Sequence, residues 1–505
     1  MSTNNFYYSK TKQKDNIPRL SPVCPVNRAG SPQKVLIFGL GLNGGGIGIA
    51  KFFSRQGAKV TVTDLKTKEA LSASLNELAR FPNIKYVLGK HRLVNFLTSD
   101  LIVKNPAIPW DDPFLEKARA KGIPITTDTI IFFSHAPALI VGITGTKGKS
   151  TTAALLAEIL KKKYPKVWLL GNIRESFLGK LSKIKPEDAV VAELSSFQLE
   201  DLALIEKSPP IAIITNIFPD HLNRYASLKN YAKAKTNIFL YQKPKDHLII
   251  NGNDKFLVKL IKNAKVPLNG AKAKKHFIKN KNLLPLEINI ALAAEAAKIL
   301  GVPKKEITKV VKNFRGLAGR QEIIRTLKNI IFINDTTATN PTAVLTGLEF
   351  LAKKYQRPII LIAGGENKNL DYKNLAEKIN RQVKKLILLP GSATEKLKKY
   401  LKINPVRSLA NIKSNNNLPS FIQNRNSIQR SGTEKIFKKF FLSKTSNGVN
   451  FSEAKNMEEA VKKAYQTSQT GDIILLSPGA ASFNLFQNEF DRGEQFNNCV
   501  LKIIS

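Results

Sequence analysis

The chain has 505 residues, 43% of them hydrophobic, and 80 lysines and arginines against 38 aspartates and glutamates give it a net charge of +42. This length has room for about three domains, each with its own core. No apolar stretch approaches the roughly 20 residues of a membrane-spanning helix, so we expect no membrane insertion. Two cysteines, Cys24 and Cys499, exclude a disulfide framework, and the N-terminus lacks a signal-peptide pattern. These features predict a cytoplasmic protein.

The positive charge raises the question of a nucleic-acid partner. An excess of this size favours anionic ligands of any kind. The lysines are nevertheless spread along the chain in pairs and triplets, as at 161–163 and 304–305, and no aromatic RNA-binding motif accompanies them. We interpret most of them as solvated helix surfaces and expect no nucleic acid. A nucleic-acid-binding module stays open as a minor alternative.

Three domains of alternating strands and helices are expected after a polar tail at residues 1–30, which is rich in proline and lacks periodicity. We place an N-terminal Rossmann-like domain at 31–127, a central domain with the parallel sheet of P-loop ATPases at 128–316, and a C-terminal Rossmann-like domain at 317–505. Within the last domain, residues of about 402–450 are rich in Asn, Ser and Lys and predict a surface insertion. The fold class is therefore α/β.

A first glycine turn follows the predicted strand Lys34–Phe38. Gly39, Gly41 and Gly44 have the spacing of a dinucleotide-binding turn, and Asp64 ends the next strand where an acidic residue would meet a ribose. Alone, this pattern favours an NAD-dependent dehydrogenase. The same backbone could instead hold the diphosphate of another nucleotide, or serve only helix–sheet packing.

A second glycine turn, Gly142–Thr152, reads Gly-Ile-Thr-Gly-Thr-Lys-Gly-Lys-Ser-Thr-Thr between an apolar run and a helical pattern. Backbone N–H groups at a helix start, with a lysine and hydroxyls beside them, form a phosphate cradle. Gly142 lies one residue too far for the strict spacing, but the end of the motif is intact. The turn predicts an ATP-using enzyme; the alternative is an ordinary glycine turn. The predicted ATP-binding residues here are Gly145, Thr146, Lys147, Gly148, Lys149, Ser150 and Thr151.

Polar residues after two further strands complete the expected site. Glu193 ends the strand Asp188–Glu193, and Asp220-His221 follows the strand Ile211–Asn216. Strand ends of a parallel sheet meet at one edge, where a carboxylate could ligate the Mg²⁺ that bridges ATP phosphates. A lone histidine is more often structural. Its place beside Lys149 and Glu193 favours a role for His221 in the site.

Four motifs together resemble the Mur ligase family: Gly-Thr-Lys-Gly-Lys-Ser-Thr, Glu-Leu-Ser-Ser-Phe-Gln-Leu-Glu, Asn-Ile-Phe-Pro-Asp-His-Leu-Asn-Arg-Tyr and Tyr-Ala-Lys-Ala-Lys. The resemblance runs from about Lys34 to the C-terminus, apart from the insertion. It is strongest to the branch that adds D-glutamate to UDP-N-acetylmuramoyl-L-alanine. It implies ATP and Mg²⁺ as cofactors, an acyl-phosphate intermediate, and UDP in place of NAD at the first glycine turn. We expect a monomer.

The resemblance also implies residue roles. Lys149, His221 and Lys235 would be catalytic, and the metal ligands would be Ser150, Glu193, His221 and Lys235. Lys235 has the position of a carbamylated lysine, with Lys233 as an alternative. Arg320 and Asp335 would join the ATP site. The UDP-substrate would contact Gly41, Leu42, Asn43, Asp64, Asn172, Ser195 and Gln198, and D-glutamate would contact Thr339, Lys368, Ser482 and Phe490.

The sequence departs from the family pattern at three places. Thr337 stands where a lysine is usual, and Gly319 stands where a histidine is common. The usual His-Asn pair is missing near Glu287-Ile-Asn289, which leaves the adenine contacts open. A sister ligase with another amino-acid acceptor therefore stays a second hypothesis.

Overall fold

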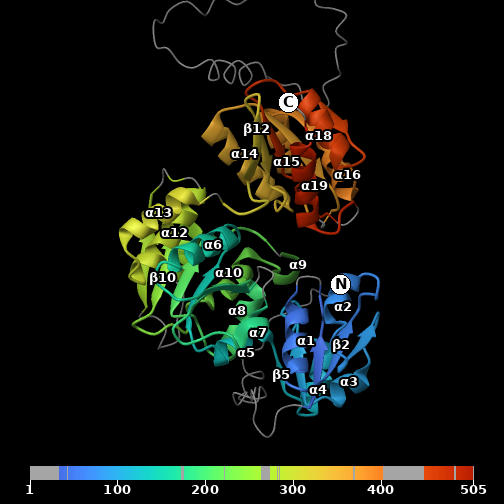
Figure 1. Cartoon of the computed structure of the whole chain (residues 1–505), viewed down its shortest axis with the longest axis vertical. Helices are drawn as coiled ribbons and strands as arrows, with labels where there is room; N and C mark the ends of the chain where they lie inside the picture. The colour runs from blue at the N-terminus through green and yellow to red at the C-terminus, as the bar shows by residue number, and fades with distance from the viewer. Residues whose placement is uncertain are drawn as a thin grey trace, which may run out of the picture. The chain divides into compact units, whose positions relative to one another are not determined.

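This computed structural model describes residues 33–41, 44–171, 176–220, 222–262, 273–280, 283, 285–314, 316–367, 370–401, 449–482 and 485–503. The predicted tail and nearly all of the predicted insertion lie outside these ranges. The chain forms two compact units, Met1–Phe314 and Arg315–Ser505 (Figure 1). The first unit holds two sheets, so the boundary predicted at residues 127 and 128 stays a prediction.

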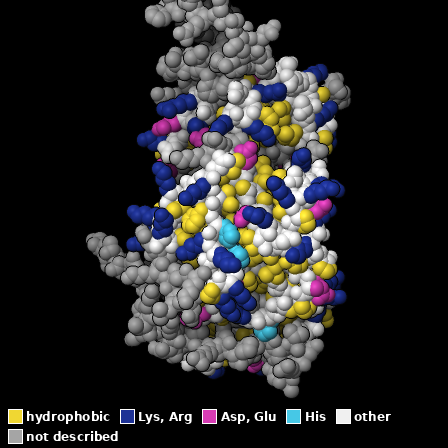
Figure 2. Space-filling view, turned by 90° about the vertical axis from the view of Figure 1, so that its left-hand side faces the viewer, with side chains coloured by type: hydrophobic (Ala, Val, Ile, Leu, Met, Phe, Trp, Pro, Cys, Tyr) yellow, Lys and Arg dark blue, Asp and Glu magenta, His cyan; other side chains and the backbone are white. Residues whose placement is uncertain are grey.

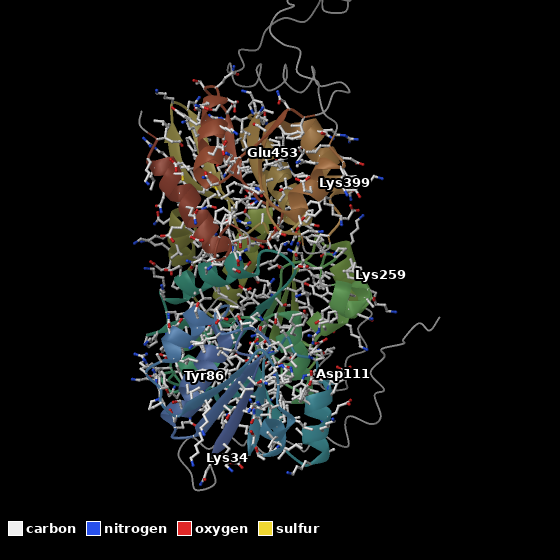
Figure 3. All side chains as sticks on the ribbon, turned by 90° about the vertical axis from the view of Figure 1, so that its right-hand side faces the viewer. Lys34, Tyr86, Asp111, Lys259, Lys399 and Glu453 are labelled. Carbon is white, nitrogen blue, oxygen red and sulfur yellow. The ribbon has the colours of Figure 1, made fainter. Side chains whose placement is uncertain are left out.

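The first sheet has five parallel strands in the order β3-β2-β1-β4-β5. Its strands are β1 (Lys34–Phe38), β2 (Lys59–Asp64), β3 (Ile84–Leu88), β4 (Leu101–Lys104) and β5 (Ile125–Thr126). The helices are α1 (Gly45–Arg55), α2 (Ser72–Leu78), α3 (Leu93–Leu97) and α4 (Pro113–Ala120). Lys34 begins the central strand, and Tyr86 lies on the edge strand (Figure 3). The apolar runs that predicted β1 and β2 are buried because helices cover the sheet.

The second sheet has six parallel strands in the order β11-β10-β9-β6-β8-β7. They are β6 (Leu139–Thr144), β7 (Val167–Gly171), β8 (Ala189–Glu193), β9 (Ile211–Ile214), β10 (His247–Asn251) and β11 (Lys274–Ile278). The helices are α6 (Lys149–Leu160), α7 (Phe177–Leu181), α8 (Ser196–Leu204), α9 (Leu222–Tyr225), α10 (Leu228–Thr236), α11 (Lys255–Lys262), α12 (Pro285–Ile299) and α13 (Lys304–Asn313). The central strand β6 leads directly into the second glycine turn.

Two apolar layers bury this sheet. Helices α6, α12 and α13 pack on one face and α8 and α10 on the other (Figure 1). The helix α5 (Asp128–His135) joins the first two sheets and packs against α7, where the rings of Phe132 and Phe177 stack with centroids 4.6 Å apart. The cores of these two sheets are therefore continuous within the first unit.

The third sheet forms the second unit, in the order β12-β13-β17-β14-β15-β16. Its strands are β12 (Glu322–Leu327), β13 (Ile330–Asn334), β14 (Ile359–Gly364), β15 (Val383–Leu389), β16 (Phe451–Glu453) and β17 (Ile473–Leu476). The helices are α14 (Pro341–Tyr355), α15 (Lys373–Gln382), α16 (Ser392–Lys398), α18 (Met457–Gln466) and α19 (Glu489–Leu501). The edge strand β12 is antiparallel to β13. The sheet is therefore mixed, with the Rossmann-like parallel pairing among its other strands.

Lysine and arginine side chains are scattered over the described part of the surface shown in Figure 2 and do not gather in one block. This distribution agrees with their spread along the sequence. Among the described helices, none is both long and apolar enough to span a bilayer.

Candidate active site at the carboxyl ends of the central strands

The second glycine turn joins β6 to α6 with backbone conformations that glycine adopts easily. Gly145 has φ 152° and Gly148 has φ 81°, and Gly148 caps the start of α6. A methyl group on Gly145 would overlap the Thr215 side chain. The helix begins at Lys149, four residues before the periodic pattern suggested. The first N–H groups of α6 therefore open at the mouth of the turn, as a phosphate site requires.

The segment after β9 holds this turn in place. The Asn216 carboxamide accepts from the Lys147 N–H at 2.9 Å and donates to the Lys147 carbonyl at 2.9 Å. The Thr215 hydroxyl also donates to the Lys147 carbonyl, at 2.6 Å, and the Thr146 hydroxyl accepts from the Phe218 N–H at 2.9 Å. Sequence reasoning gave Thr215 and Asn216 no role. They are the first two residues after the buried strand β9, which is the signal that could have identified them.

Lys149 folds back over its own turn. Its Nζ donates to the carbonyl oxygens of Gly145 at 3.0 Å and Thr146 at 3.2 Å. This position keeps the ammonium at the mouth of the loop, where it could reach a phosphate oxygen by rotating about its side-chain bonds.

Lys235 and Lys233 have opposite environments on α10. Lys233 is exposed, whereas Lys235 is 1% exposed and its Nζ donates to the Thr144 hydroxyl at 3.3 Å. The same Nζ lies 4.7 Å from the centre of the Tyr231 ring. Burial lowers the pKa of Lys235 well below its ordinary value, and the charge of Lys149 adds to that effect. Of the two candidates, only Lys235 lies beside the glycine turn.

Glu193 and Ser150 bring oxygen donors to the same region. Glu193 ends β8, pairs in register with Ile143 of β6 and is 2% exposed, while Ser150 lies in the first turn of α6 and is 6% exposed. The charges of Glu193 and Asp220 act on Lys235 and partly oppose the fall in its pKa. Lys149, Glu193 and Lys235 therefore belong to one electrostatic cluster around the turn.

The donor set fits Mg²⁺, which prefers carboxylate and hydroxyl oxygens and keeps several waters. Glu193 supplies a carboxylate and Ser150 a hydroxyl. An uncharged Lys235 amine is a poor ligand for this ion, whereas a carbamate on it would add carboxylate-like oxygens. Among the residues that the structure describes, no group of three or more His, Cys, Asp or Glu side chains forms a ready metal site.

Asn289 approaches the glycine turn from α12. A methyl group placed on Gly148 would overlap the Asn289 carboxamide, so this side chain lies directly against the backbone of the turn. The sequence left the contacts of this region open. Asn289 lies beside the start of α6, although Ile288 and not a histidine precedes it.

Ser195 and Gln198 form a capping box at the start of α8. The Ser195 hydroxyl accepts from the Gln198 N–H at 3.3 Å, and the Gln198 Oε1 accepts from the Ser195 N–H at 2.9 Å. These bonds explain locally why α8 begins at Ser196, three residues after Glu193. The predicted contact of both residues with the UDP-substrate stays a prediction.

The first glycine turn is held by Asp64. Its Oδ2 accepts from the Gly41 N–H at 3.1 Å and its Oδ1 from the Lys66 N–H at 2.9 Å. The carboxylate therefore organises the turn from the end of β2. Its predicted contact with the UDP-substrate stays a prediction, as does that of Gly41.

In the second unit, two predicted ATP-site segments lie side by side. Thr337 donates from its N–H and its hydroxyl to the Gly319 carbonyl, at 3.1 and 3.0 Å. These bonds join the turn that carries Arg320 to the loop that carries Asp335. Asp335 is 7% exposed, and its Oδ2 accepts from the Ser477 hydroxyl at 2.9 Å.

Two of the four predicted D-glutamate residues, Thr339 and Ser482, lie on neighbouring loops of the same unit. Thr339 is next to Ala338, whose carbonyl accepts from the Gly479 N–H at 2.8 Å, and buried Ser482 follows three residues later. Phe490 is in the first turn of α19.

Sequence reasoning missed Arg492, which is fully buried in α19. Its guanidinium donates to the Thr336 carbonyl at 2.9 Å and the Ala480 carbonyl at 3.1 Å. Arg492 therefore holds the loop after β13 against the loop after β17. A buried arginine could not be told from a surface one by its place in the sequence.

Five predicted site residues lie outside the described ranges: Leu42, Asn43, Asn172, His221 and Lys368. Their roles stay predictions.

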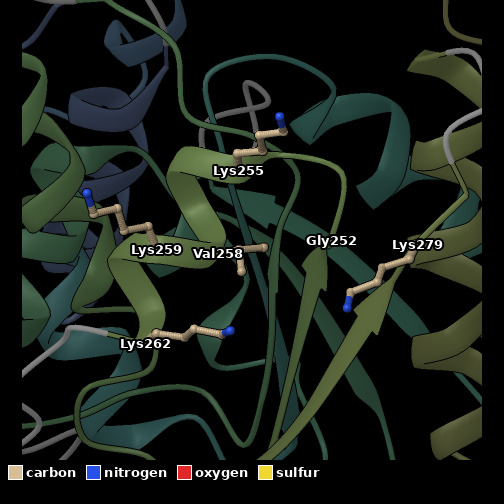
Figure 4. Close-up of a pocket in the computed structure, with 6 residues that line it drawn as sticks. All are labelled: Gly252, Lys255, Val258, Lys259, Lys262 and Lys279. Atoms are coloured by element: carbon tan, nitrogen blue, oxygen red, sulfur yellow. The ribbon is translucent and has the colours of Figure 1, made fainter.

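A hollow of about 430 Å³ lies on the central domain (Figure 4). It is lined by Gly252, Lys255, Val258, Lys259, Lys262 and Lys279. Lys262 and Lys279 point into it from opposite walls. With no carboxylate or hydroxyl side chain in its lining, it lacks the donors that a magnesium–phosphate site uses.

Comparison with known protein families identifies the family of this chain. Three family profiles match successive parts of the chain: the N-terminal domain of MurD-like Mur ligases over residues 33–127, the Mur ligase middle domain over 143–310, and the glutamate ligase domain of Mur ligases over 319–479. The chain belongs to the Mur ligase family. The resemblance inferred from the motifs is confirmed, and the dehydrogenase interpretation of the first glycine turn is not favoured.

Curated relatives of this Mur ligase match almost its whole length. The UDP-N-acetylmuramoylalanine–D-glutamate ligase of Roseiflexus sp. (strain RS-1) is 36% identical over 503 residues, covering 93% of this chain and 98% of that protein. The enzymes of the same name from Borreliella afzelii and Alkaliphilus oremlandii are 34% and 32% identical, with 92% and 93% of this chain covered and 97% and 98% of theirs.

Solved structures support the same three-domain fold. The UDP-N-acetylmuramate-alanine ligase MurC of Thermotoga maritima aligns over 93% of this chain and 99% of its own, with a TM-score of 0.54 and 18% identity. MurF ligase of the same organism, solved in complex with ADP, aligns over 88% of this chain and 95% of its own, with a TM-score of 0.51 and 14% identity.

Proposed function

We propose that this Mur ligase joins D-glutamate to UDP-N-acetylmuramoyl-L-alanine with the hydrolysis of ATP, a step of peptidoglycan precursor synthesis in the cytoplasm. The observation that carries the proposal is the end-to-end match to relatives of this one name, at 32 to 36% identity over more than nine tenths of the chain. The clustering of Lys149, Glu193 and Lys235 around a glycine turn supports the phosphate chemistry.

The proposed reaction makes a poor electrophile reactive. A carboxylate oxygen of the UDP-substrate forms a bond to the γ-phosphorus as the bond to ADP breaks, which gives an acyl phosphate. The amino nitrogen of D-glutamate then forms the amide bond at the carbonyl carbon, inorganic phosphate leaves, and the nitrogen gives up a proton to solvent. Lys149 would neutralise charge that develops on the transferred phosphoryl group.

We propose that Ser150, Glu193 and His221, with a carbamate on Lys235, would hold Mg²⁺. When bound, the ion would screen the phosphate charges and polarise the phosphoryl oxygen. Burial keeps the Lys235 amine uncharged at lower pH than an exposed lysine. This supports carbamylation, because only a neutral amine adds to CO₂.

We propose the predicted UDP-substrate, ATP and D-glutamate residues as the binding groups, with a monomer as the working form and no nucleic acid as a partner. Lys368 and the hydroxyls of Thr339 and Ser482 would suit the two carboxylates of D-glutamate, since cations and hydroxyls satisfy carboxylate oxygens.

A phosphate-release assay with omission controls tests the proposed function. Release should require ATP, Mg²⁺, UDP-N-acetylmuramoyl-L-alanine and D-glutamate together, and the product should have the mass of the D-glutamyl adduct. Turnover with another amino acid but none with D-glutamate would move the assignment to a sister ligase. Phosphate release without any amide product would contradict ligase activity.

A further inference from the structure

One arginine connects three elements of the first unit. Arg224 of α9 donates from Nη1 to the Ala107 carbonyl at 2.7 Å, and from Nη2 to the Glu200 carboxylate of α8 at 3.3 Å. Its guanidinium carbon lies 4.2 Å from the centre of the Phe197 ring. Ala107 belongs to the loop of residues 105–110, which follows β4 of the first sheet. Arg224 therefore ties this loop to two helices of the central domain.

The next residue along α8 makes a second tie to the same loop. Trp110 donates from its indole nitrogen to the Asp201 carboxylate at 3.0 Å. The Lys104 Nζ lies 3.6 Å from the same Asp201 oxygen and donates to the Ile108 carbonyl at 3.0 Å. Lys104 and Asp201 are 0% and 1% exposed. A charge pair buried this completely fixes its partners, because separating them would leave an uncompensated charge in the interior.

The other side of this loop faces the first glycine turn. The Asn105 N–H donates to the Phe38 carbonyl at 2.8 Å, and a methyl group on Gly39 would lie 3.0 Å from Ile108 and 3.1 Å from Asn105. The loop is thus in contact with the turn proposed to hold UDP. It is also bonded to α8, which begins just after Glu193, and to α9, which follows the segment that holds the phosphate turn.

We propose that Arg224 and Asp201 are positioning residues for the ligase reaction. They fix the 105–110 loop, and with it the first glycine turn, against α8 and α9. A nucleotide-linked substrate would be anchored at the first glycine turn. Its carboxylate end would then lie next to the γ-phosphate held at the second glycine turn. The inference rests on the proposed function. Its physical basis is that reacting atoms must be held at about 3 to 3.5 Å, and a shift of 1 Å can cost about 100-fold in rate.

Steady-state kinetics of full-length Arg224→Gln tests the inference. We expect kcat to fall by about 10- to 100-fold at saturating substrates, and KM for the UDP-substrate to rise. ADP affinity should stay at the wild-type value, because Arg224 does not touch the phosphate turn, and the melting temperature should fall only slightly, because Arg224 is half-buried at the edge of the core. Arg224→Lys keeps the positive charge and one donor nitrogen, and should recover part of kcat. The matched control is Arg80→Gln, an exposed arginine that stacks on Phe81 at 5.5 Å and lies outside these contacts.

A second variant separates positioning from loss of folding. Glu200→Gln removes the charge that faces Arg224, and the double variant with Arg224→Gln should lose less than the product of the two single effects. An Arg224→Gln enzyme with wild-type kcat and KM would overturn the inference and leave the ligase assignment intact. A parallel loss of ADP binding, melting temperature and kcat, with no recovery in Arg224→Lys, would also overturn it. A wild-type chain that forms no amide would overturn both.

Discussion

The decisive residue-scale feature is the contrast between two lysines at the second glycine turn, Lys149 and Lys235. Lys149 stays at the polar mouth of its turn, bonded to backbone carbonyls, whereas Lys235 is buried against Thr144 and Tyr231. The same functional group therefore has two chemistries. We propose that the half-buried Lys149 ammonium neutralises phosphate and that the buried Lys235 amine is the one that is modified.

Carbamylation of Lys235 can be observed directly. We expect the wild-type protein, equilibrated with carbon-13-labelled CO₂ near neutral pH, to show one carbamate resonance by NMR. Lys235→Ala should lose it, and Lys233→Ala should keep it, because Lys233 is exposed. The resonance should fade as the pH falls, since the protonated amine cannot carry CO₂. A resonance that survives in Lys235→Ala would contradict the assignment.

Replacement of Lys149 tests the phosphate turn. We expect Lys149→Ala to reduce kcat by about 100- to 1,000-fold, because one preorganised charge at the transferring group is lost. The melting temperature should change little, since the side chain lies outside the hydrophobic core. Lys161→Ala, which removes an exposed lysine at the end of α6, is the control. Wild-type turnover in Lys149→Ala would rule out the assigned role.

At the scale of elements, the turn before α6 combines backbone conformation with close packing. Gly148 and Gly122 have similar φ angles, 81° and 76°, but only Gly148 faces another side chain, Asn289. Alanine at either position costs about 1 to 2 kcal/mol of backbone strain. We expect only Gly148→Ala to weaken ADP binding as well, measured by calorimetry. Equal ADP affinities in the two variants would contradict a nucleotide site at this turn.

The helix α5 carries a buried acid at its start. Burial raises the pKa of Asp128 to about 6, Asp201 of α8 adds to the shift, and Lys104 of β4 opposes it. The folded state therefore binds this proton more tightly than the unfolded state, and the contribution of Asp128 to stability falls as pH rises from about 4 to about 6.

Asp128→Asn should remove the loss of stability that comes from ionising this buried carboxyl group as the pH rises. We expect the free energy of unfolding to rise at pH 7.5, by about 3 kcal/mol at most, since each pKa unit is worth about 1.36 kcal/mol. The gain should shrink toward pH 4. Asp188→Asn is a control with the opposite expected effect, a loss of stability at pH 7.5. Hydrogen bonds to the Asp188 carboxylate, above all the one from Trp168, lower the pKa of this group. Urea unfolding at several pH values measures both. A loss of stability in Asp128→Asn at pH 7.5 would contradict the shift.

The elements show what the sequence could predict. Apolar runs and glycine spacing predicted β1, β2, β6 and the glycine turn before α6, because these signals are local. Which of Lys233 and Lys235 is buried depends on how α10 packs, and the contact of Asn289 with Gly148 joins positions far apart in the chain. The Asp64 carboxylate, expected at a ribose, is bonded to its own turn. Local sequence patterns do not predict these tertiary contacts.

At the scale of the whole molecule, the described part of the chain forms three sheets. The first two share a continuous core, and the third stands in a unit of its own. Glycine turns lie at strand ends in the first two, where open parallel sheets hold ligands. The net charge of +42 is spread along the sequence, and on the described part of the face shown in Figure 2 the basic side chains are dispersed.

The central claim is that one phosphate site converts the substrate carboxylate into an acyl phosphate, and an isotope-transfer measurement tests it most directly. The substrate UDP-N-acetylmuramoyl-L-alanine is prepared with oxygen-18 in both carboxylate oxygens and turned over with ATP and D-glutamate. The account predicts one labelled oxygen in the released phosphate and one in the new amide. Amide product accompanied by wholly unlabelled phosphate would contradict it.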